Sequence, residues 1–478
     1  MSLLTIIGLL PLVISVLIVA IPSKNVGLIK KVAFAGTTLI AIISILLAIG
    51  FDKSDTSLQY VQSNAWIPTF NINYSVGVDG ISLVLILLST ILVPIVVLAT
   101  WHESDAGRWS AKVFYVFFEA MLIPIYFLIG GYGSGNKSAA AVKFLLYSLF
   151  GGLLMLASII GVYVISGNQI GATFDLAQLA TLEIDNRTEN FLFLGFFIAF
   201  AIKAPLWPFH TWLPDAAKAA TPGTSVLLLG VLDKVGTYGM IRFCIQLFPD
   251  ASKTFTPLII TLAVISIIYG AFMAIGPKDI KGLIAFTSIS HFGFITMGIF
   301  AMTSQGMSGA NLYMVNHGFS TAALFLIAGW MMMRRGSSTI SDFGGLQRVT
   351  PVMAWTFFIA GMSSLALPGL SSFVSEFLVL VGTYTRYPVA AIIGTLGIIL
   401  AALYILIPVQ KILHGPTTPG NENLTDLNLR EKIAIAPVIL VIVLMGFYPK
   451  PVLDLINPTS EQVVINAGFS DPVAKVGK

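Results

Sequence analysis

The sequence predicts an all-α, polytopic membrane protein. Of its 478 residues, 56% are hydrophobic and only 10% are charged, whereas a typical soluble protein carries about 25% charged residues. The apolar residues gather in runs of roughly 18–26, and a helix of that length crosses the roughly 30 Å hydrocarbon core of a bilayer. These observations exclude a soluble globular protein, and a net charge of only +4 gives no indication of nucleic-acid binding.

About thirteen membrane spans are expected along a single transmembrane domain, 1–478. Each is an apolar run bounded by charged residues, glycine or proline. The N-terminal run lacks a basic leader and a small-residue cleavage site, so we interpret it as an uncleaved first span. The expected spans are 3–21, 31–50, 80–101, 112–130, 141–165, 191–212, 222–247, 256–275, 280–302, 308–333, 351–383, 388–411 and 433–449.

Two of these spans are interrupted by proline. The stretch AIKAPLWPFHTWLPDA places Pro205 and Pro208 just after Lys203. The stretch SSLALPGLSSFVSEFLVL places Pro368 before Glu376. Proline removes a helical hydrogen bond, and inside lipid such a break survives only where the freed backbone faces protein or water. One broken helix in each half, each beside an ionisable residue, predicts two inverted repeats of a transporter core; two ordinary proline kinks are the alternative.

The distribution of positive charge leaves the number of spans one short. Lysine and arginine are enriched in cytoplasmic loops, which places 102–111 and 131–143 on the inner side and the acidic segments 51–79 and 166–190 outside. Two loops on one side need an even number of crossings, yet a single apolar run separates 102–111 from 131–143. The number of crossings between these two loops is therefore one short.

These observations divide the chain into consecutive parts. The expected parts are three N-terminal helices over 1–101, a first and incomplete inverted repeat over 112–247, a second inverted repeat over 256–411, a last helix over 433–449 and a polar tail over 459–478.

Six titratable side chains lie deep in the expected spans, where a charged residue costs about 2.5–3.5 kcal/mol or more and marks a functional site. Burial penalises the charged form of each, so such groups can exchange protons rather than hold them. Pairing Glu119 with Lys203 would restore both charges, and separating the pair would release the proton of Lys203; a static buried ion pair is the alternative. The candidate relay residues are Glu119, Lys203, Lys234, His291, His317 and Glu376.

Other interpretations stay open for several of these residues. For Lys234 the alternative is that its side chain reaches the membrane interface, against which its central position argues. His291 and His317 are either relay groups or hydrogen-bonded structural histidines. A haem held by these two histidines lacks any supporting axial pattern.

Three further polar residues lie close to the candidates. His210 and Asp215 are expected at the membrane edge, either at the mouth of a relay or at the cap of a helix end. Asp233 precedes Lys234 and therefore points about 100° away around the helix. It is either a local counter-charge or another proton acceptor.

No cofactor or metal site is expected in this chain. Its one cysteine, Cys244, excludes an iron–sulfur cluster held by this chain alone, a disulfide framework and a CxxC redox site. The stretch GGYGSGNKS (130–138) combines glycines with a lysine, as phosphate-binding loops do. However, Asn136 separates Gly135 from Lys137 and no strand precedes the stretch. We interpret it as a loop between helices.

The chain resembles the antiporter-like membrane subunits of respiratory complex I, the proton-pumping NADH:quinone oxidoreductase. Glutamate at position 376 and the absence of a long lateral helix favour the branch known as chain M, or subunit 4 in mitochondria. The similar stretches run in order along nearly the whole chain: VDGISLVLILLS (78–89), FFEAMLIPIYFLIG (117–130), IKAPLWPFHTWLPDAAKAATPG (202–223), LIAFTSISHFGFITMG (283–298), NHGFSTAALFLIAG (316–329) and LALPGLSSFVSEFLVL (365–380).

The resemblance implies a role for each candidate residue. The modulating glutamate belongs to helix 5 of the family, the lysines to broken helix 7 and helix 8, the relay histidines to helices 10 and 11, and the terminal residue to broken helix 12. In chain order the corresponding residues here are Glu119, Lys203, Lys234, His291, His317 and Glu376.

The sequence departs from the family where the span count is short. The family carries its helix 4 between the third span and the span with Glu119, whereas only HESDAGRWSA (102–111) stands there in this chain. Either the helix has been lost, or the sequence lacks the segment that encodes it. A true loss would damage the symmetry of the first repeat.

The resemblance also implies a function without redox chemistry in this chain. Protons would be taken up around Lys203 and Lys234, pass His291 and His317, and leave near Glu376, driven by quinone reduction elsewhere in the complex. NAD, FMN, iron–sulfur clusters and quinone are expected in partner subunits. The expected neighbours are L-like and N-like membrane-arm subunits and lipid, with the peripheral arm contacted indirectly, in the bacterial inner (plasma) membrane.

Three alternatives to this function remain. The first is a subunit of a multisubunit sodium/proton antiporter, which usually has lysine where this chain has Glu376. The second is the equivalent subunit of a membrane hydrogenase or of a ferredoxin-driven complex. The third is a spacer subunit that no longer pumps because it has lost helix 4.

Overall fold

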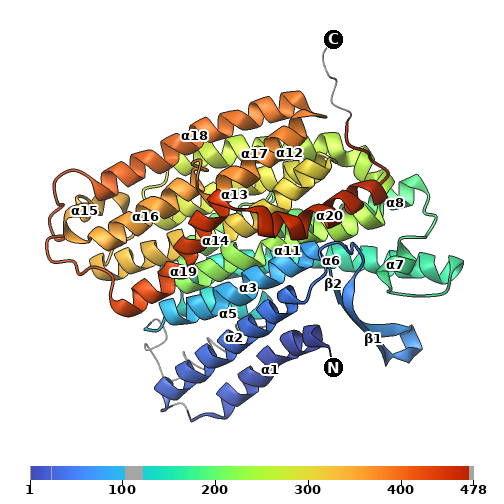
Figure 1. Ribbon diagram of the computed structural model, residues 1–478, viewed down its shortest axis with the longest axis horizontal. Helices are drawn as coiled ribbons and strands as arrows, with labels where there is room; N and C mark the ends of the chain where they lie inside the picture. The colour runs from blue at the N-terminus through green and yellow to red at the C-terminus, as the bar shows by residue number, and fades with distance from the viewer. Residues whose placement is uncertain (1, 23, 103–121, 473–478) are drawn as a thin grey trace.

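The computed structural model describes residues 2–22, 24–102 and 122–472. It is a bundle of long helices that lie roughly side by side (Figure 1), as expected for a multi-pass membrane protein. In chain order the longer helices are α1 (Leu3–Ala20), α2 (Val26–Ile49), α3 (Gly80–Ala99), α5 (Leu122–Tyr132), α6 (Lys137–Gln169), α8 (Asn186–Lys203), α12 (Pro249–Ile275), α13 (Ile280–Phe300), α14 (Ser304–Arg335), α16 (Pro351–Ser364), α17 (Ser371–Tyr384), α18 (Pro388–Leu413), α19 (Leu429–Phe447) and α20 (Lys450–Asn466).

The prediction of an all-α polytopic membrane protein is confirmed, whereas the number of spans is not tested. Within the described ranges, nine helices are long and apolar enough to cross a membrane, or ten if the bent pair α19 and α20 is one span. The interrupted spans contribute shorter helices such as α17, and much of the expected span 112–130 lies outside the described residues. The count of about thirteen therefore stays a prediction.

Both expected breaks are present at the proline-containing stretches. Helix α8 ends at Lys203, and the chain resumes a helix only at α9 (Trp212–Ala219). The indole Nε1 of Trp212 donates a hydrogen bond to the carbonyl oxygen of Ile202 at 2.9 Å, and the backbone N–H of Trp207 donates to Ser266 Oγ at 2.8 Å. The freed backbone is thus satisfied by protein groups, as the apolar surroundings require.

The second break separates α16 from α17 around Pro368. The side-chain amide of Asn316, on α14, donates a hydrogen bond to the carbonyl oxygen of Ser371 at 2.7 Å. This contact supports the backbone at the first residue of α17, close to Glu376.

The expected span 222–247 is not a regular α-helix. It consists of α10 (Pro222–Leu227), a π-helical segment η3 (Leu228–Leu232), α11 (Lys234–Gly239) and a second π-helical segment η4 (Met240–Ile245). A π-helical turn is rare and occurs often at functional sites, because it displaces the side chains that follow it. Lys234 lies directly between the two π-helical segments.

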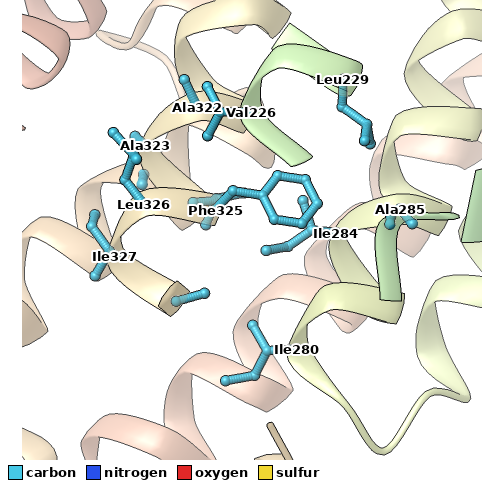
Figure 2. Packing of buried hydrophobic residues seen from close by; sticks show 14 of the residues in the cluster. Val226, Leu229, Ile280, Ile284, Ala285, Ala322, Ala323, Phe325, Leu326 and Ile327 are labelled. Atoms are coloured by element: carbon cyan, nitrogen blue, oxygen red, sulfur yellow. The ribbon is translucent and has the colours of Figure 1, made fainter. Parts of the chain in front are cut away.

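Helix α14 occupies the interior of the bundle and is buried along its whole apolar window. Figure 2 shows its Phe325 pointing toward Ile284 of α13, with Val226 of α10 nearby. A Cβ added at Gly309 of α14 would lie 2.7 Å from the backbone nitrogen of Val379 on α17. Small residues at such contacts let helices approach closely in lipid, where apolar burial alone does not drive association.

Two elements outside the core were not expected from the sequence. The segment 51–79, which the charge distribution predicts to lie outside, contains an antiparallel hairpin, β1 (Gln59–Ile67) and β2 (Ile72–Val78), which projects from the bundle in Figure 1. The chain also turns by 68° between α19 and α20. Because α20 extends to Asn466, the segment expected as a polar tail, 459–478, begins inside a helix. Asn311 of α14 donates a hydrogen bond to Ser460 of α20 at 3.0 Å.

Candidate functional site

The centre of the candidate site is a lysine on α11 and a histidine on α14. Lys234 Nζ lies 2.7 Å from His317 Nδ1, and the two side chains are only 3% and 1% exposed. Lys234 also donates a hydrogen bond to the carbonyl oxygen of Leu229, in the π-helical segment η3. The structure thus brings together two predicted relay residues that are 83 positions apart in the chain.

The partners of His317 determine how its ring can carry a proton. When Lys234 is charged, Nδ1 must accept the hydrogen bond from the ammonium group, so the hydrogen of the neutral ring is on Nε2. Nε2 lies 3.2 Å from Ser288 Oγ and 3.2 Å from Thr321 Oγ1. The ring therefore connects Lys234 on one side to two hydroxyl groups on the other.

Asp233 is a counter-charge for Lys234. Its Oδ1 lies 2.9 Å from Lys234 Nζ, and its side chain is fully buried. Apart from this ion pair, neither carboxylate oxygen of Asp233 has a hydrogen-bond partner among the described residues. A buried carboxylate is costly unless it is paired, so the contact with Lys234 accounts for its position and favours the interpretation of Asp233 as a local counter-charge.

The second half of the site runs from His291 to Glu376. The rings of His291 and His317 have their centroids 5.4 Å apart, and those of His291 and Tyr313 lie 5.7 Å apart. The hydroxyl of Tyr313 donates a hydrogen bond to Glu376 Oε2 at 3.3 Å. Glu376 is 5% exposed, on the helix that follows the second break. The four side chains form a buried polar row across α13, α14 and α17.

Tyr313 was not among the predicted residues, although the sequence contains a signal for it. It precedes His317 by four positions on the same helix, and residues at that spacing share one helix face. Ser288 precedes His291 on α13 by three positions, so the same argument applies. The prediction was based on charged and titratable side chains, whereas hydroxyl groups complete the row in the structure.

Lys203 lies on a different helix from the residues of this row. Lys203 is the last residue of α8 and is half-buried. The next residue, Ala204, packs against Gly236 of α11 so closely that an added Cβ would lie 2.6 Å from its backbone nitrogen. The helices that carry Lys203 and Lys234 are therefore in contact. Glu119 lies outside the described residues, and its pairing with Lys203 stays a prediction.

The two residues expected at the membrane edge have different surroundings. Asp215, in the first turn of α9, pairs with Lys143 of α6 through an Oδ2–Nζ distance of 2.7 Å and is half-exposed. A carboxylate in that position also interacts favourably with the helix N-terminus. His210 is only 3% exposed and contacts the ring of Tyr269.

A further buried ion pair was not predicted. Asp79 caps the N-terminus of α3 and pairs with Arg242 in the π-helical segment η4. The Nε group of Arg242 also donates a hydrogen bond to the hydroxyl of Tyr238 at 3.2 Å. These contacts fasten α3 to the span that carries Lys234. Within the described part of the chain, no cluster of three or more His, Cys, Asp or Glu side chains could hold a metal ion.

Comparisons with known proteins show which proteins this chain is similar to. The chain matches the family model described as NADH:quinone oxidoreductase/Mrp antiporter, TM, over residues 110–401. It is 46% identical to NADH-quinone oxidoreductase subunit M of Mycobacterium tuberculosis (strain ATCC 25618 / H37Rv), covering 99% of this chain and 96% of the relative. That alignment runs over 529 positions against 478 residues here, so the relative has at least about 50 positions without a counterpart.

Solved structures show the same fold. A chain of respiratory complex I from Thermus thermophilus with bound NADH has a TM-score of 0.87 at 28% identity, covering 97% of this chain and 99% of that one. A chain of the Mrp complex from Dietzia sp. DQ12-45-1b has a TM-score of 0.86, covering 97% and 98%. Its identity is 20%, so this second likeness shows the fold alone.

Proposed function

Because this chain belongs to the NADH:quinone oxidoreductase/Mrp antiporter transmembrane family, we propose that it translocates protons as a membrane-arm subunit of a respiratory complex I. The relative from Mycobacterium tuberculosis carries the name subunit M over nearly the full length of both chains. The observation that carries the proposal is the continuous buried row from Lys234 to Glu376, because a proton path through lipid needs titratable groups at short intervals.

Proton movement begins at Lys234, whose ammonium group faces His317 Nδ1 at 2.7 Å. Transfer of a proton to Nδ1 leaves a neutral lysine and a doubly protonated ring. Loss of the proton on Nε2, toward Ser288 or Thr321, then returns the ring to a neutral form. The two nitrogens of one ring thus connect Lys234 on α11 with hydroxyl groups on α13 and α14.

The remaining steps lead from His317 to the terminal carboxyl group. The 5.4 Å between the ring centroids of the two histidines suits a transfer through hydroxyl groups or ordered water. From His291 the path continues past Tyr313, which is hydrogen-bonded to Glu376. Movement of one charge against the membrane potential costs about 2.3 kcal/mol per 100 mV, which must come from outside this chain.

In this proposal, the charges of Lys203 and Glu119 control proton transfer at Lys234. Helix α8 contacts α11 next to Lys203, so a change in charge at Lys203 acts on Lys234 across a short, poorly screened distance. Pairing with Glu119 in one state, and separation in another, alters the proton affinity of both lysines. Quinone reduction elsewhere in the complex drives that change.

Redox cofactors belong to partner subunits in this proposal. The single cysteine, Cys244, is fully buried, whereas a cluster held by protein thiolates needs several cysteines. NAD, FMN, iron–sulfur clusters and quinone are therefore assigned to other chains, L-like and N-like subunits are the neighbours, and the bacterial inner membrane is the location.

Native mass spectrometry of the complex that co-purifies with this chain tests the assignment. Flavin-bearing and iron–sulfur NADH-oxidising subunits are the expected partners. Small antiporter subunits without any redox partner, together with sodium-dependent transport, would contradict the proposal and favour an Mrp-type antiporter. Hydrogenase or ferredoxin-oxidising partners would keep the relay but replace the electron donor.

A further inference from the structure

The π-helical segment η3 lies directly before Lys234, and one of its backbone hydrogen bonds differs from that of an α-helix. The N–H of Asp233 donates to the carbonyl oxygen of Leu228 at 3.3 Å, five positions earlier in the chain. In an α-helix the same N–H would donate to Leu229, four positions earlier. The carbonyl oxygen of Leu229 has therefore lost its α-helical donor, although a backbone oxygen buried away from water needs one.

The ammonium group of Lys234 stands in the place of the missing backbone bond. Its Nζ donates a hydrogen bond to the carbonyl oxygen of Leu229 and lies 2.9 Å from Asp233 Oδ1. Leu229 and Asp233 are the two residues that one α-helical hydrogen bond would join. The charged side chain thus bridges the two sides of the wide turn, and charge-assisted contacts of this kind are roughly twice as strong as neutral ones.

This bridge is buried, so water cannot replace it. Leu229 and Asp233 are fully buried, and Lys234 is only 3% exposed. The ammonium group also lies 5.3 Å from the centroid of the Phe292 ring, on α13. Charges interact more strongly in such surroundings than in water. The positive charge of Lys234 therefore stabilises the π-helical form of the turn.

We propose that η3 is a backbone switch set by the charge of Lys234, an inference that rests on the proposed proton-translocating function. While Lys234 is charged, the bridge holds the π-helical turn. Transfer of the proton from Nζ to His317 Nδ1 leaves a neutral amine, which holds Leu229 and Asp233 less strongly. The Asp233 N–H then moves from Leu228 to Leu229, and the turn becomes α-helical. One proton changes place and no electron is transferred.

The coupling between proton and backbone acts in both directions. A proton that favours one of two conformations is bound more tightly by that conformation, because binding and conformational change share one free energy. The π-helical form of η3 therefore binds the proton of Lys234 more tightly than the α-helical form does. A movement imposed on this span from outside can accordingly load or discharge the lysine.

The surroundings of the span leave room for such a change. A cavity of about 450 Å³ lies between α1, α3 and the span. Its walls are mostly apolar, with Val231 and Val235 among them, and Lys234 lines it as well. Beyond α11, the ion pair of Arg242 with Asp79 fastens the second π-helical segment, η4, to α3. The change in η3 is therefore confined to the part of the span before this anchor.

Electron cryo-microscopy of the intact complex tests the switch, because a map that places carbonyl groups shows which oxygen accepts the Asp233 N–H. Lys234→Met removes the charge and keeps an unbranched side chain. Lys234→Arg keeps a charge that the side chain cannot release, and the neighbouring cavity has room for the larger group. Lys281→Met is the matched control, because Lys281 is also buried and donates to a backbone carbonyl, that of Ala220, at 3.0 Å.

The three variants have different expected outcomes. We expect the Asp233 N–H to donate to Leu229 in Lys234→Met, and to stay on Leu228 in both Lys234→Arg and Lys281→Met. A π-helical turn that persists in Lys234→Met would overturn the proposal. Loss of the turn in Lys234→Arg or in Lys281→Met would overturn it too, because the charge at position 234 would then not be what holds the turn.

Deletion of Val231 tests the switch with Lys234 in place. A π-helical turn holds one residue more than an α-helical turn, so the deletion leaves a regular helix on which Lys234 still faces His317. We expect the number of protons pumped per electron to fall to that of Lys234→Met, whereas an unchanged ratio in an assembled complex would overturn the proposal. If this chain does not pump at all, Lys234→Met also keeps an unchanged ratio, so failure of the inference is distinguishable from failure of the proposed function.

Discussion

Lys234 is a buried cation that faces three acceptors: the carbonyl oxygen of Leu229, Asp233 and His317. Charge-assisted hydrogen bonds of this kind offset part of the cost of removing a charge from water. The three acceptors also differ in chemistry. The histidine can take the proton on one nitrogen and release another from the opposite nitrogen, whereas the carbonyl oxygen fixes the position and Asp233 supplies a negative charge.

Replacement of Asp233 is therefore expected to change the protonation of Lys234. Asp233→Asn keeps the shape of the side chain but leaves Lys234 without its anion, and the loss of one partner of a buried pair costs about 3–5 kcal/mol. We expect Lys234 to lose its proton in this variant and proton pumping by sealed vesicles to fall. Asp250→Asn, which breaks an exposed pair with Lys253, is the control; equal pumping by the two variants would contradict the role given to Asp233.

The hydroxyl of Tyr313 is expected to matter as much as the charged residues. Tyr313→Phe keeps the ring between His291 and Glu376 and removes the hydrogen bond to Glu376. Loss of a positioned proton donor slows transfer by about 10²-fold or more, so proton flux through this chain should nearly stop while the complex still assembles. The control is Tyr448→Phe on the surface, at 61% exposure, and the measurement is the rate of vesicle acidification during NADH oxidation.

Whether each of these residues could be predicted from the sequence depends on the chemistry of its side chain. Lys234, His317 and Glu376 could be predicted because a charged or titratable side chain in the middle of an apolar run has few structural explanations. Tyr313 could not, because an aromatic residue in an apolar run is ordinary. The role of its hydroxyl group becomes visible only when α13, α14 and α17 come together.

Among the helices, the two broken spans were predicted because proline interrupts a helix at its own position in the sequence. The two π-helical segments around Lys234 carry no such mark in the sequence, although the span that contains them packs against α8 and α14. The hairpin β1–β2 was missed for another reason. Its first strand, QYVQSNAWI, mixes polar and apolar residues without the regular alternation that indicates a strand.

Close contact between α14 and α17 holds Tyr313 against Glu376, and glycine makes that contact possible. A Cβ at Gly309 would lie 2.7 Å from Val379 N and 2.8 Å from Leu378 Cβ, and overpacking of this kind costs about 1–3 kcal/mol. We expect Gly309→Ala to lower the thermal unfolding midpoint of the purified complex. Gly8→Ala, where nothing lies within 4 Å, should leave it unchanged, and equal midpoints would show that the helices separate easily.

At the scale of the whole molecule, the family could be predicted from the sequence and the comparisons confirm it. The order of long motifs along the chain was sufficient, because each motif surrounds a break or a buried ionisable residue. The position of each motif in space was not available from the sequence. The bend into α20, for example, depends on contacts with α14 such as the one between Asn311 and Ser460.

The missing helix is also a property of the whole chain. The positive-charge count and the family pattern both place a gap near 102–111, and the alignment with the Mycobacterium tuberculosis relative is longer than this chain. If the protein truly lacks helix 4, the intact subunit will have a mass near 51.3 kDa in a denaturing mass spectrum. A mass higher by about 3 kDa, the weight of one span of 20 or more residues, would mean that the protein contains the helix.

The central claim is that protons cross this chain along the row that begins at Lys234. The most direct test is the number of protons pumped per electron by the intact complex in sealed vesicles, with Lys234→Met compared with Lys432→Met, a change at an exposed lysine of α19. The account predicts a lower ratio for Lys234→Met and an unchanged ratio for Lys432→Met, with both complexes fully assembled. An unchanged ratio in an assembled Lys234→Met complex would mean that protons take another route or that this chain does not pump.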